Sequence, residues 1–137
     1  MEPRHWPGIR EPTPSVTYYI GWYYGHPEAE ALESELDAAV IDAFRRCVPP
    51  GGRLYALDWM HPSYSADPHA ISAAELRVPV LPNGDYYLYL APDLSFGTFG
   101  HPWEQTICVF GAPLLAATES NRPRLLTRAV RSHVAAA

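Results

Sequence analysis

The chain has 137 residues, of which 47% are hydrophobic and 18% charged, a composition typical of one folded domain rather than of a disordered segment. Its net charge of −5 and its ten basic residues, all of them arginine, argue against a basic nucleic-acid-binding surface and against lysine chemistry. No apolar run approaches the roughly 20 residues of a membrane span, and the polar, proline-rich start does not resemble a signal peptide, so we expect a cytoplasmic protein.

The first third of the chain predicts an arm, a strand and a long helix. Residues 1–14 contain four prolines and are expected to form an irregular arm, with one domain over 15–137. Residues 15–24 are β-branched and aromatic throughout, which predicts a strand. Residues 26–52 predict a helix, because apolar side chains recur at helical spacing and a Pro-Pro-Gly-Gly run ends the segment.

The middle of the chain predicts a strand, a long loop and a hairpin. Residues 53–59 form a short apolar run, typical of a strand. The polar segment 60–76 is expected to be a loop with a helical turn at 72–76. An Asn-Gly pair between the apolar runs 77–81 and 86–91 is a strong signal for a β-hairpin.

The last third predicts two more strands and a terminal helix. Residues 95–99 are compatible with a short strand, and residues 105–111 with a buried one. Residues 112–117 are expected to form a short apolar helix or turn. The arginine-rich segment 122–134 is predicted to be a helix with Leu125, Leu126, Ala129 and Val130 on its buried side.

This order of elements predicts the α+β class. We expect an antiparallel or mixed sheet of about five strands packed against one long helix, with a second helix at the C-terminus. The long helix is rich in acids and the terminal helix in arginines, so the two are expected to lie side by side.

Three segments, "LYALDWMHPSY", "PNGDYYLYL" and "FGTFGHPWEQTICVFG", resemble a bacterial family known as domain of unknown function 2716. The resemblance extends from "EPTPSVTY" to "CVFG". It implies a single bacterial domain and brings with it no activity.

Polar side chains gather in two loops that follow predicted strands. Asp58 and His61 lie in "DWMHPSY", and His101 and Glu104 lie in "GHPWE". If both strands end at one rim of the sheet, two imidazoles and two carboxylates meet there, and a histidine beside a carboxylate can act as an acid or a base near neutral pH. These four residues are the predicted catalytic group, and Glu104 is the strongest single candidate, because it directly precedes a buried strand.

Four more residues are predicted to contact a substrate: Trp59, Tyr64, Asp67 and Trp103. Each candidate also has a structural interpretation. The two histidines can bond the backbone of turns, Asp58 can cap a strand end, and the tryptophans can be packing residues.

The same four catalytic candidates could instead bind a metal ion, as a set of two histidines and two carboxylates. Their spacings lie in loops and lack the helical His-Glu-x-x-His pattern, so the prediction is that no metal is bound. Cys47 and Cys108 form no CxxC pair and are predicted to be inert.

Two functions are compatible with these residues. The first is a cofactor-independent acid–base enzyme that acts on a small molecule by isomerisation, cyclisation, elimination or hydrolysis. The second is a protein-binding module, such as an immunity protein that neutralises a basic toxin through an acidic helix face. A third possibility is a ligand-binding module without chemistry. We expect no nucleic-acid or membrane partner, and the oligomeric state stays open.

Overall fold

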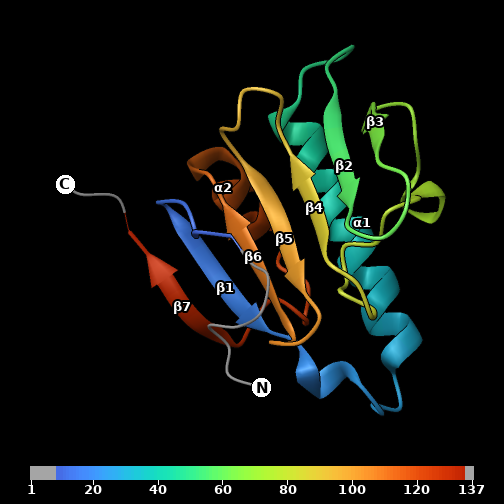
Figure 1. Ribbon diagram of the computed structural model, residues 1–137, viewed down its shortest axis with the longest axis vertical. Helices are drawn as coiled ribbons and strands as arrows, with labels where there is room; N and C mark the ends of the chain where they lie inside the picture. Colours follow the sequence, from blue (N-terminus) through green and yellow to red (C-terminus); the bar gives the residue numbers. More distant parts are fainter. Residues whose placement is uncertain (1–8, 135–137) are drawn as a thin grey trace.

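The computed structural model describes residues 9–134, which form a seven-stranded antiparallel sheet with two helices on one of its faces (Figure 1). The strand order is β3-β2-β4-β5-β6-β1-β7, and every neighbouring pair is antiparallel. The bounds are β1 (Ser15–Tyr19), α1 (Ala29–Cys47), β2 (Leu54–Asp58), β3 (Tyr64–Ala66), β4 (Tyr87–Leu90), β5 (Gly97–His101), β6 (Thr106–Phe110), α2 (Ala112–Ser120) and β7 (Ala129–His133).

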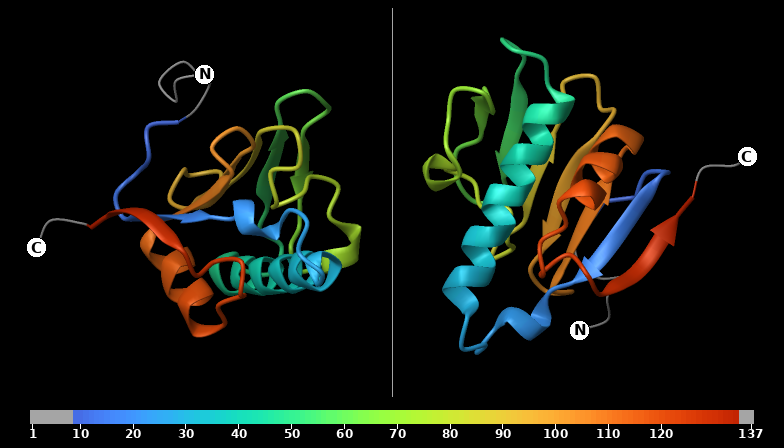
Figure 2. Two further views of the ribbon diagram at one scale, coloured as in Figure 1. Left: turned by 90° about the horizontal axis from the view of Figure 1, so that it is seen from below. Right: turned by 180° about the vertical axis from the view of Figure 1, so that it is seen from behind.

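Helix α1 packs beside α2 against one face of the sheet and supplies most of the core (Figure 2, right). Leu32, Leu36, Val40 and Phe44 recur every four residues, so they share one side of the helix, and all four are buried. The Phe44 ring lies 5.1 Å from that of Tyr89 on β4. Each such side chain contributes about 1.5–3 kcal/mol by leaving water. The predicted helix over 26–52 is thus confirmed, with shorter ends.

The sheet has two more strands than predicted, and both lie at its edges. β3 lies within the segment expected to be a loop, and β7 lies within the expected C-terminal helix. The prediction of a helix over 122–134 is wrong. Leu125 and Leu126 are buried as expected, but Ala129 and Val130 are exposed on a strand that pairs with β1. Pairing of β7 satisfies the hydrogen-bonding groups of one edge of β1, an effect that outweighs a weak helical pattern.

The predicted hairpin of 77–81 with 86–91 is also wrong in its first half. β4 pairs with β2 and β5, and no strand forms over 77–81. That segment is apolar because Val78, Val80 and Leu81 are buried in the core, not because they alternate on a strand. Pro79 within this segment and Pro82 directly after it have no N–H to donate to a strand partner.

Several shorter predictions are confirmed with altered bounds. The strand expected over 15–24 ends at Tyr19 and is followed by a 3-10 turn at Gly21–Tyr23. The helical turn expected near 72–76 is a 3-10 turn at Ala73–Glu75. The short helix expected at 112–117 is α2. The acid–arginine contact also exists, because Arg124 Nη2 lies 3.0 Å from Glu35 of α1, although Arg124 is not on a helix.

The face of the sheet opposite α1 and α2 carries no helix within residues 9–134, and we call it the open face (Figure 2, left). Residues 9–14, which have no helix or strand, lead into β1. Glu11 anchors this segment on the open face: its carboxylate accepts hydrogen bonds from Arg131 (2.8 Å), Thr17 (2.7 Å) and His133 (3.0 Å). The arm is therefore bound to both β1 and β7.

Two further findings concern the whole described region. The two cysteines are free, with Cys108 buried in β6 and Cys47 at the end of α1. Among residues 9–134, no helix combines the length and the apolar character that crossing a membrane requires.

The contacts of Glu11 predict how stability responds to acid. Burial alone would raise the pKa of Glu11, but hydrogen bonds from Arg131, Thr17 and His133 lower it to about 2. A lowered pKa gives stability that is complete above the unfolded-state value and is lost as the pH falls towards 2. We expect Glu11→Gln to melt several degrees below the wild type at pH 7, and the gap to close between pH 4.5 and 2. Thermal melts followed by circular dichroism measure this, and a gap that is constant with pH would contradict it.

Candidate functional site

The eight candidate residues predicted from the sequence lie in three places in the structure. Asp58, Trp59 and His61 are at the end of β2. His101, Trp103 and Glu104 are at the turn between β5 and β6. Tyr64 and Asp67 are on β3 and the loop after it.

The end of β2 holds a cluster of three titratable side chains, Asp58, His61 and Asp85, which we call the acid cluster. His61 Nδ1 lies 3.3 Å from Asp58 Oδ1 and 3.5 Å from Asp85 Oδ2. The carboxylate of Asp58 accepts hydrogen bonds from the backbone N–H groups of the two residues that follow the end of β2, Met60 (3.0 Å) and His61 (3.1 Å). Asp85 accepts the N–H of Tyr86 (2.8 Å) and that of Met60 (3.2 Å).

The two carboxyl groups of the acid cluster lie side by side, and their pKa values shift in opposite directions. Burial, followed by the hydrogen bond and charge of Asp58, raises the pKa of Asp85. Burial would also raise the pKa of Asp58, but hydrogen bonds from Asp85, the Met60 N–H and His61 outweigh it and lower that pKa. The two pKa directions thus favour a proton on Asp85 over one on Asp58.

Sequence reasoning missed Asp85. It directly follows the Asn-Gly pair that was interpreted as a hairpin turn, where an aspartate is an ordinary turn residue. The sequence did hold a signal for Asp85. It is a carboxylate directly before an apolar run, and the same feature makes Glu104 a candidate.

Beside the acid cluster, the open face has a groove of about 440 Å³. Its walls are apolar and aromatic, apart from Asp58. The lining residues are Ile9, Leu57, Asp58, Trp59, Tyr86, Leu88 and Phe99. The volume is in the range of small-molecule sites. Since Asp58 belongs to both the groove and the acid cluster, the two features meet at the end of β2.

Tyr86 links the groove to the turn between β5 and β6. Its ring lies 5.7 Å from that of Trp59, 6.0 Å from Phe99 and 4.9 Å from His101. The Tyr86 hydroxyl is buried and has no hydrogen-bond partner in the part of the chain that the structure describes. Burial of an unsatisfied hydroxyl costs about 1–3 kcal/mol.

Tyr86 lies between the two loops, because its ring contacts those of both Trp59 and His101. His101 is buried, its Nδ1 accepts the Glu104 N–H (3.2 Å), and burial lowers its pKa, with an opposing effect from Glu104. Burial would raise the pKa of Glu104, but hydrogen bonds from Arg131 (2.5 Å) and Thr106 (2.6 Å) lower it. Trp103 is exposed on the turn between them. The structure thus gives His101 a hydrogen bond inside a turn and pairs Glu104 with an arginine.

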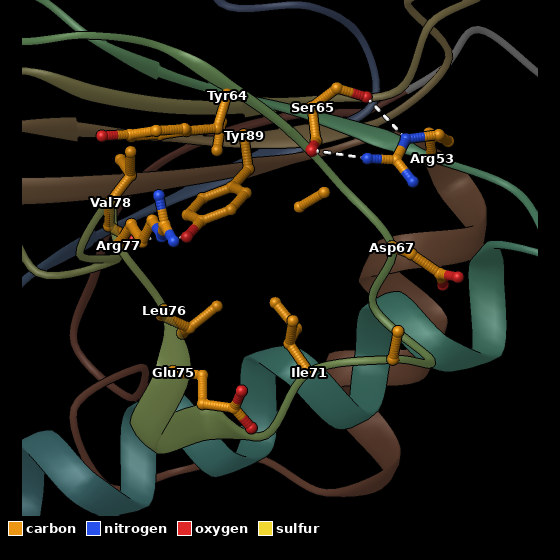
Figure 3. A pocket seen from close by; sticks show the side chains of 13 residues that line it. Arg53, Tyr64, Ser65, Asp67, Ile71, Glu75, Leu76, Arg77, Val78 and Tyr89 are labelled. Carbon is orange, nitrogen blue, oxygen red and sulfur yellow. Dashed lines mark hydrogen bonds between the residues drawn. The ribbon is translucent and has the colours of Figure 1, made fainter.

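Tyr64 and Asp67 belong to a second pocket, of about 320 Å³, on the helix side of the sheet (Figure 3). Ile71, Leu76 and Tyr89 point into this pocket, whereas Asp67 points away from it. Two arginines lie at its rim. Arg53 donates to Ser65 Oγ (2.7 Å), and the Arg77 guanidinium lies 5.2 Å from the centre of the Tyr64 ring. The pocket is therefore separate from the acid cluster.

The comparisons with known proteins identify the family. Residues 1–115 match the family described as Protein of unknown function (DUF2716). The chain belongs to this family. It is also similar to the Uncharacterized protein YxiI of Bacillus subtilis (strain 168), with 38% identity over 105 residues, which are 74% of this chain and 65% of that protein. The match thus spans slightly less than two thirds of the length of that relative. No solved structure matches the chain.

The family resemblance stated from the sequence motifs is therefore confirmed. The acid cluster and the groove both lie within the part of the chain that matches the DUF2716 family, whereas β7 and its Arg131 follow that part.

The raised pKa of Asp85 in this DUF2716 protein predicts a pH dependence for Asp85→Asn. An amide can keep the bond from the Tyr86 N–H and donate to Asp58 at every pH, as the protonated acid does. Because the pKa of Asp85 is raised, the wild type is stabilised at low pH and loses that stability as the pH rises through the pKa. In a buffer with a chelator, we expect the melting temperature of Asp85→Asn minus that of the wild type to increase from pH 4 to pH 8.

The control for this measurement is Asp85→Ala, which removes the acceptor of the Tyr86 N–H and should melt below the wild type at each pH. A difference between Asp85→Asn and the wild type that does not vary with pH would mean that Asp85 holds no extra proton.

The unpartnered hydroxyl of Tyr86 predicts that Tyr86→Phe melts at or above the wild type, by as much as about 1 kcal/mol or roughly 3–5 °C. Tyr89→Phe is the matched comparison, because the Tyr89 hydroxyl is also buried but donates to the Val78 carbonyl. We expect that variant to melt several degrees lower. Equal losses in the two variants would show that the Tyr86 hydroxyl has a partner after all.

Proposed function

We propose that the protein binds a small, flat and mainly apolar molecule in the open-face groove and moves a proton on it with the acid cluster. The observation that carries this proposal is the position of Asp58, which lines the groove and also lies 3.3 Å from His61 in the acid cluster. A binding surface and a proton-holding group therefore meet at one residue.

The lining of the groove supports the binding half of the proposal. Aromatic side chains provide flat surfaces on which a ring can stack, and Trp59 is 65% exposed, so a ligand can cover much of it. No arginine lines the groove among the described residues, which favours a ligand without a strong negative charge.

The state of the acid cluster supports the chemical half. A pair of carboxyl groups with separated pKa values provides one acid and one base, and His61, which is 69% exposed, can exchange protons with solvent. Such a group is sufficient for isomerisation, cyclisation, elimination or hydrolysis without an organic cofactor, and general acid–base catalysis contributes about 10²–10⁴-fold.

The other predicted site residues have smaller parts in this proposal. His101 supports the aromatic wall through Tyr86, and Glu104 is held by Arg131 beside it. Their catalytic roles stay predictions, as do the substrate contacts of Trp103, Tyr64 and Asp67. A location in the cytoplasm is likewise part of the proposal.

The binding half is tested with N-phenyl-1-naphthylamine, a neutral probe that fluoresces in apolar sites. We expect the wild type to enhance its fluorescence with saturation, and Leu88→Glu to abolish the effect by placing a charge in the groove. Tyr55→Glu is the matched control, because Tyr55 is exposed on neighbouring β2 but does not line the groove. Equal binding by all three proteins would place the probe elsewhere.

The chemical half is tested with 5-nitrobenzisoxazole, a flat, neutral molecule. A base removes the proton on C3, the electron pair of that bond forms a nitrile, and the ring N–O bond breaks to give a coloured phenolate. We expect saturable acceleration that falls by at least about tenfold in Asp58→Asn. Probe binding without any such rate would instead indicate a ligand-binding module that does no acid–base chemistry.

A second candidate function is a protein-binding module for a basic partner. The observation that favours it is an acidic surface on α1, lined by Glu30, Glu33 and Asp37, next to the exposed Tyr24. Burial, followed by the charge of Glu33, raises the pKa of Asp37 to about 6, so a nearby cation would relieve repulsion there. This function would be favoured if the groove takes up no probe and Glu33→Lys abolishes binding to an oligo-arginine peptide.

A further inference from the structure

We propose that Asp58, His61 and Asp85 form a binding site for a divalent transition-metal ion, with Zn²⁺ as the reference ion. This inference rests on the proposed function in one respect, because it names the ion that would act in the same acid cluster. The sequence alone predicts that no metal is bound, and the ligand set considered there includes His101 and Glu104. In the site proposed here, Asp85 replaces these two residues.

The first argument is the spacing of the three side chains. Zn²⁺ binds nitrogen at about 2.0–2.1 Å and carboxylate oxygen at about 2.0–2.2 Å, so two ligand atoms at a tetrahedral angle are about 3.4 Å apart. His61 Nδ1 is 3.3 Å from Asp58 Oδ1 and 3.5 Å from Asp85 Oδ2. One ligand atom of each residue lies within 4.8 Å of the others.

These separations are longer than those of an ordinary hydrogen bond. Nitrogen–oxygen hydrogen bonds in proteins lie at about 2.7–3.2 Å, and charged ones are shorter still. The imidazole nitrogen thus faces both carboxylates, with one long hydrogen bond to Asp58 and a still longer contact to Asp85. An ion placed between the three atoms would bond all three of them.

The second argument is charge. The side chains of Asp58 and Asp85 are only 9% and 7% exposed, and two adjacent carboxylates repel one another when both are ionised. The chain has no lysine, and within residues 9–134 neither carboxylate has an arginine partner. Either a proton or a cation must offset the repulsion. A divalent cation bound between the two carboxylates would do so directly.

The third argument is the support around the ligands. Backbone N–H groups of Met60, His61 and Tyr86 hold the carboxylate oxygens in place, as the outer partners of metal ligands do in known sites. Because these bonds are already present, the site needs no folding of a loop around the ion.

The ligand set indicates the class of ion and its role. An imidazole nitrogen disfavours Mg²⁺ and Ca²⁺, which prefer oxygen ligands, and favours Zn²⁺, while the two carboxylates also suit Mn²⁺. Three protein ligands leave a fourth position open, which is typical of catalytic rather than structural zinc sites. Zn²⁺ lowers the pKa of a water bound to it, so water held at that position would supply a base at the end of the groove.

The test is isothermal titration of chelator-treated protein with ZnCl₂ and MnCl₂ at pH 7. We expect one ion per chain, and binding at least about tenfold weaker in His61→Ala and in Asp85→Asn, since even outer partners of metal ligands are worth about 10–100-fold. His61 is exposed, so its replacement leaves the fold intact. Asp67→Asn is the matched control, because Asp67 accepts the His69 N–H (2.9 Å) in a similar Asp–His pair and should bind as the wild type does.

The outcomes separate this inference from the proposed function. Equal affinity in the wild type, His61→Ala and Asp85→Asn would place the ion elsewhere and overturn the inference, as would no binding at all. If the naphthylamine probe still binds and the benzisoxazole is still opened in the presence of a chelator, the proposed function survives such a failure. Conversely, site-dependent metal binding without either probe effect would support the metal site and overturn the proposed function.

Discussion

The packing of α1 against one face of the sheet is the interaction on which the rest of the structure depends. This helix packs over β4, and α2 packs over β6 and β1, so that face of the sheet becomes the core. The opposite face has no such cover, yet it carries Phe99, Leu88 and Leu57 on adjoining strands. Because helices bury only one face of the sheet, the open face has a shallow apolar surface that only side chains and the arm can shield from water.

The open face is protected by different means at its two halves. Over β1, β6 and β7, an ionic network of Glu11, Arg131 and Glu104 joins three separate segments. Over β2, β4 and β5, the surface is aromatic and contains the groove. The acid cluster stands at the end of this second half, so its carboxylates lie at the border between the core and the solvent. A site of this kind combines poor solvation of charge with easy access, which are the two conditions that acid–base chemistry and metal binding share.

The sequence allowed the helix face, the buried β6 and the family to be predicted, because each depends on a local pattern. The apolar side of α1 repeats at helical spacing, and every residue of β6 is apolar or small enough to be buried. β7 could not be predicted in this way. Its five residues are all exposed, and the strand exists only because β1 offers an unpaired edge. Pairing between strands that are far apart in sequence leaves no local pattern from which it could be predicted.

The candidate site shows the same division between local and distant causes. Asp58 and His61 are three residues apart, and their contact follows from one turn, so sequence reasoning placed them together correctly. Asp85 joins them because β4 lies beside β2, a pairing of segments about 30 residues apart that no local pattern reveals. In the same way, Glu104 stood out as an acid beside a buried strand, but its partner Arg131 belongs to the strand that was predicted as a helix.

The position of β1 has a consequence for how the chain folds. β1 is made early in synthesis, but both of its partners, β6 and β7, follow much later, and Ser15 pairs with both Phe110 and His133. Strands β2, β4, β5 and β6, by contrast, are close in sequence and can assemble with α1 as the chain emerges. Contacts between distant segments form slowly, because a long loop must close first. β1 is therefore expected to pair late in folding. Until it does, the backbone N–H and C=O groups along one edge of β6 are open to pairing with other chains.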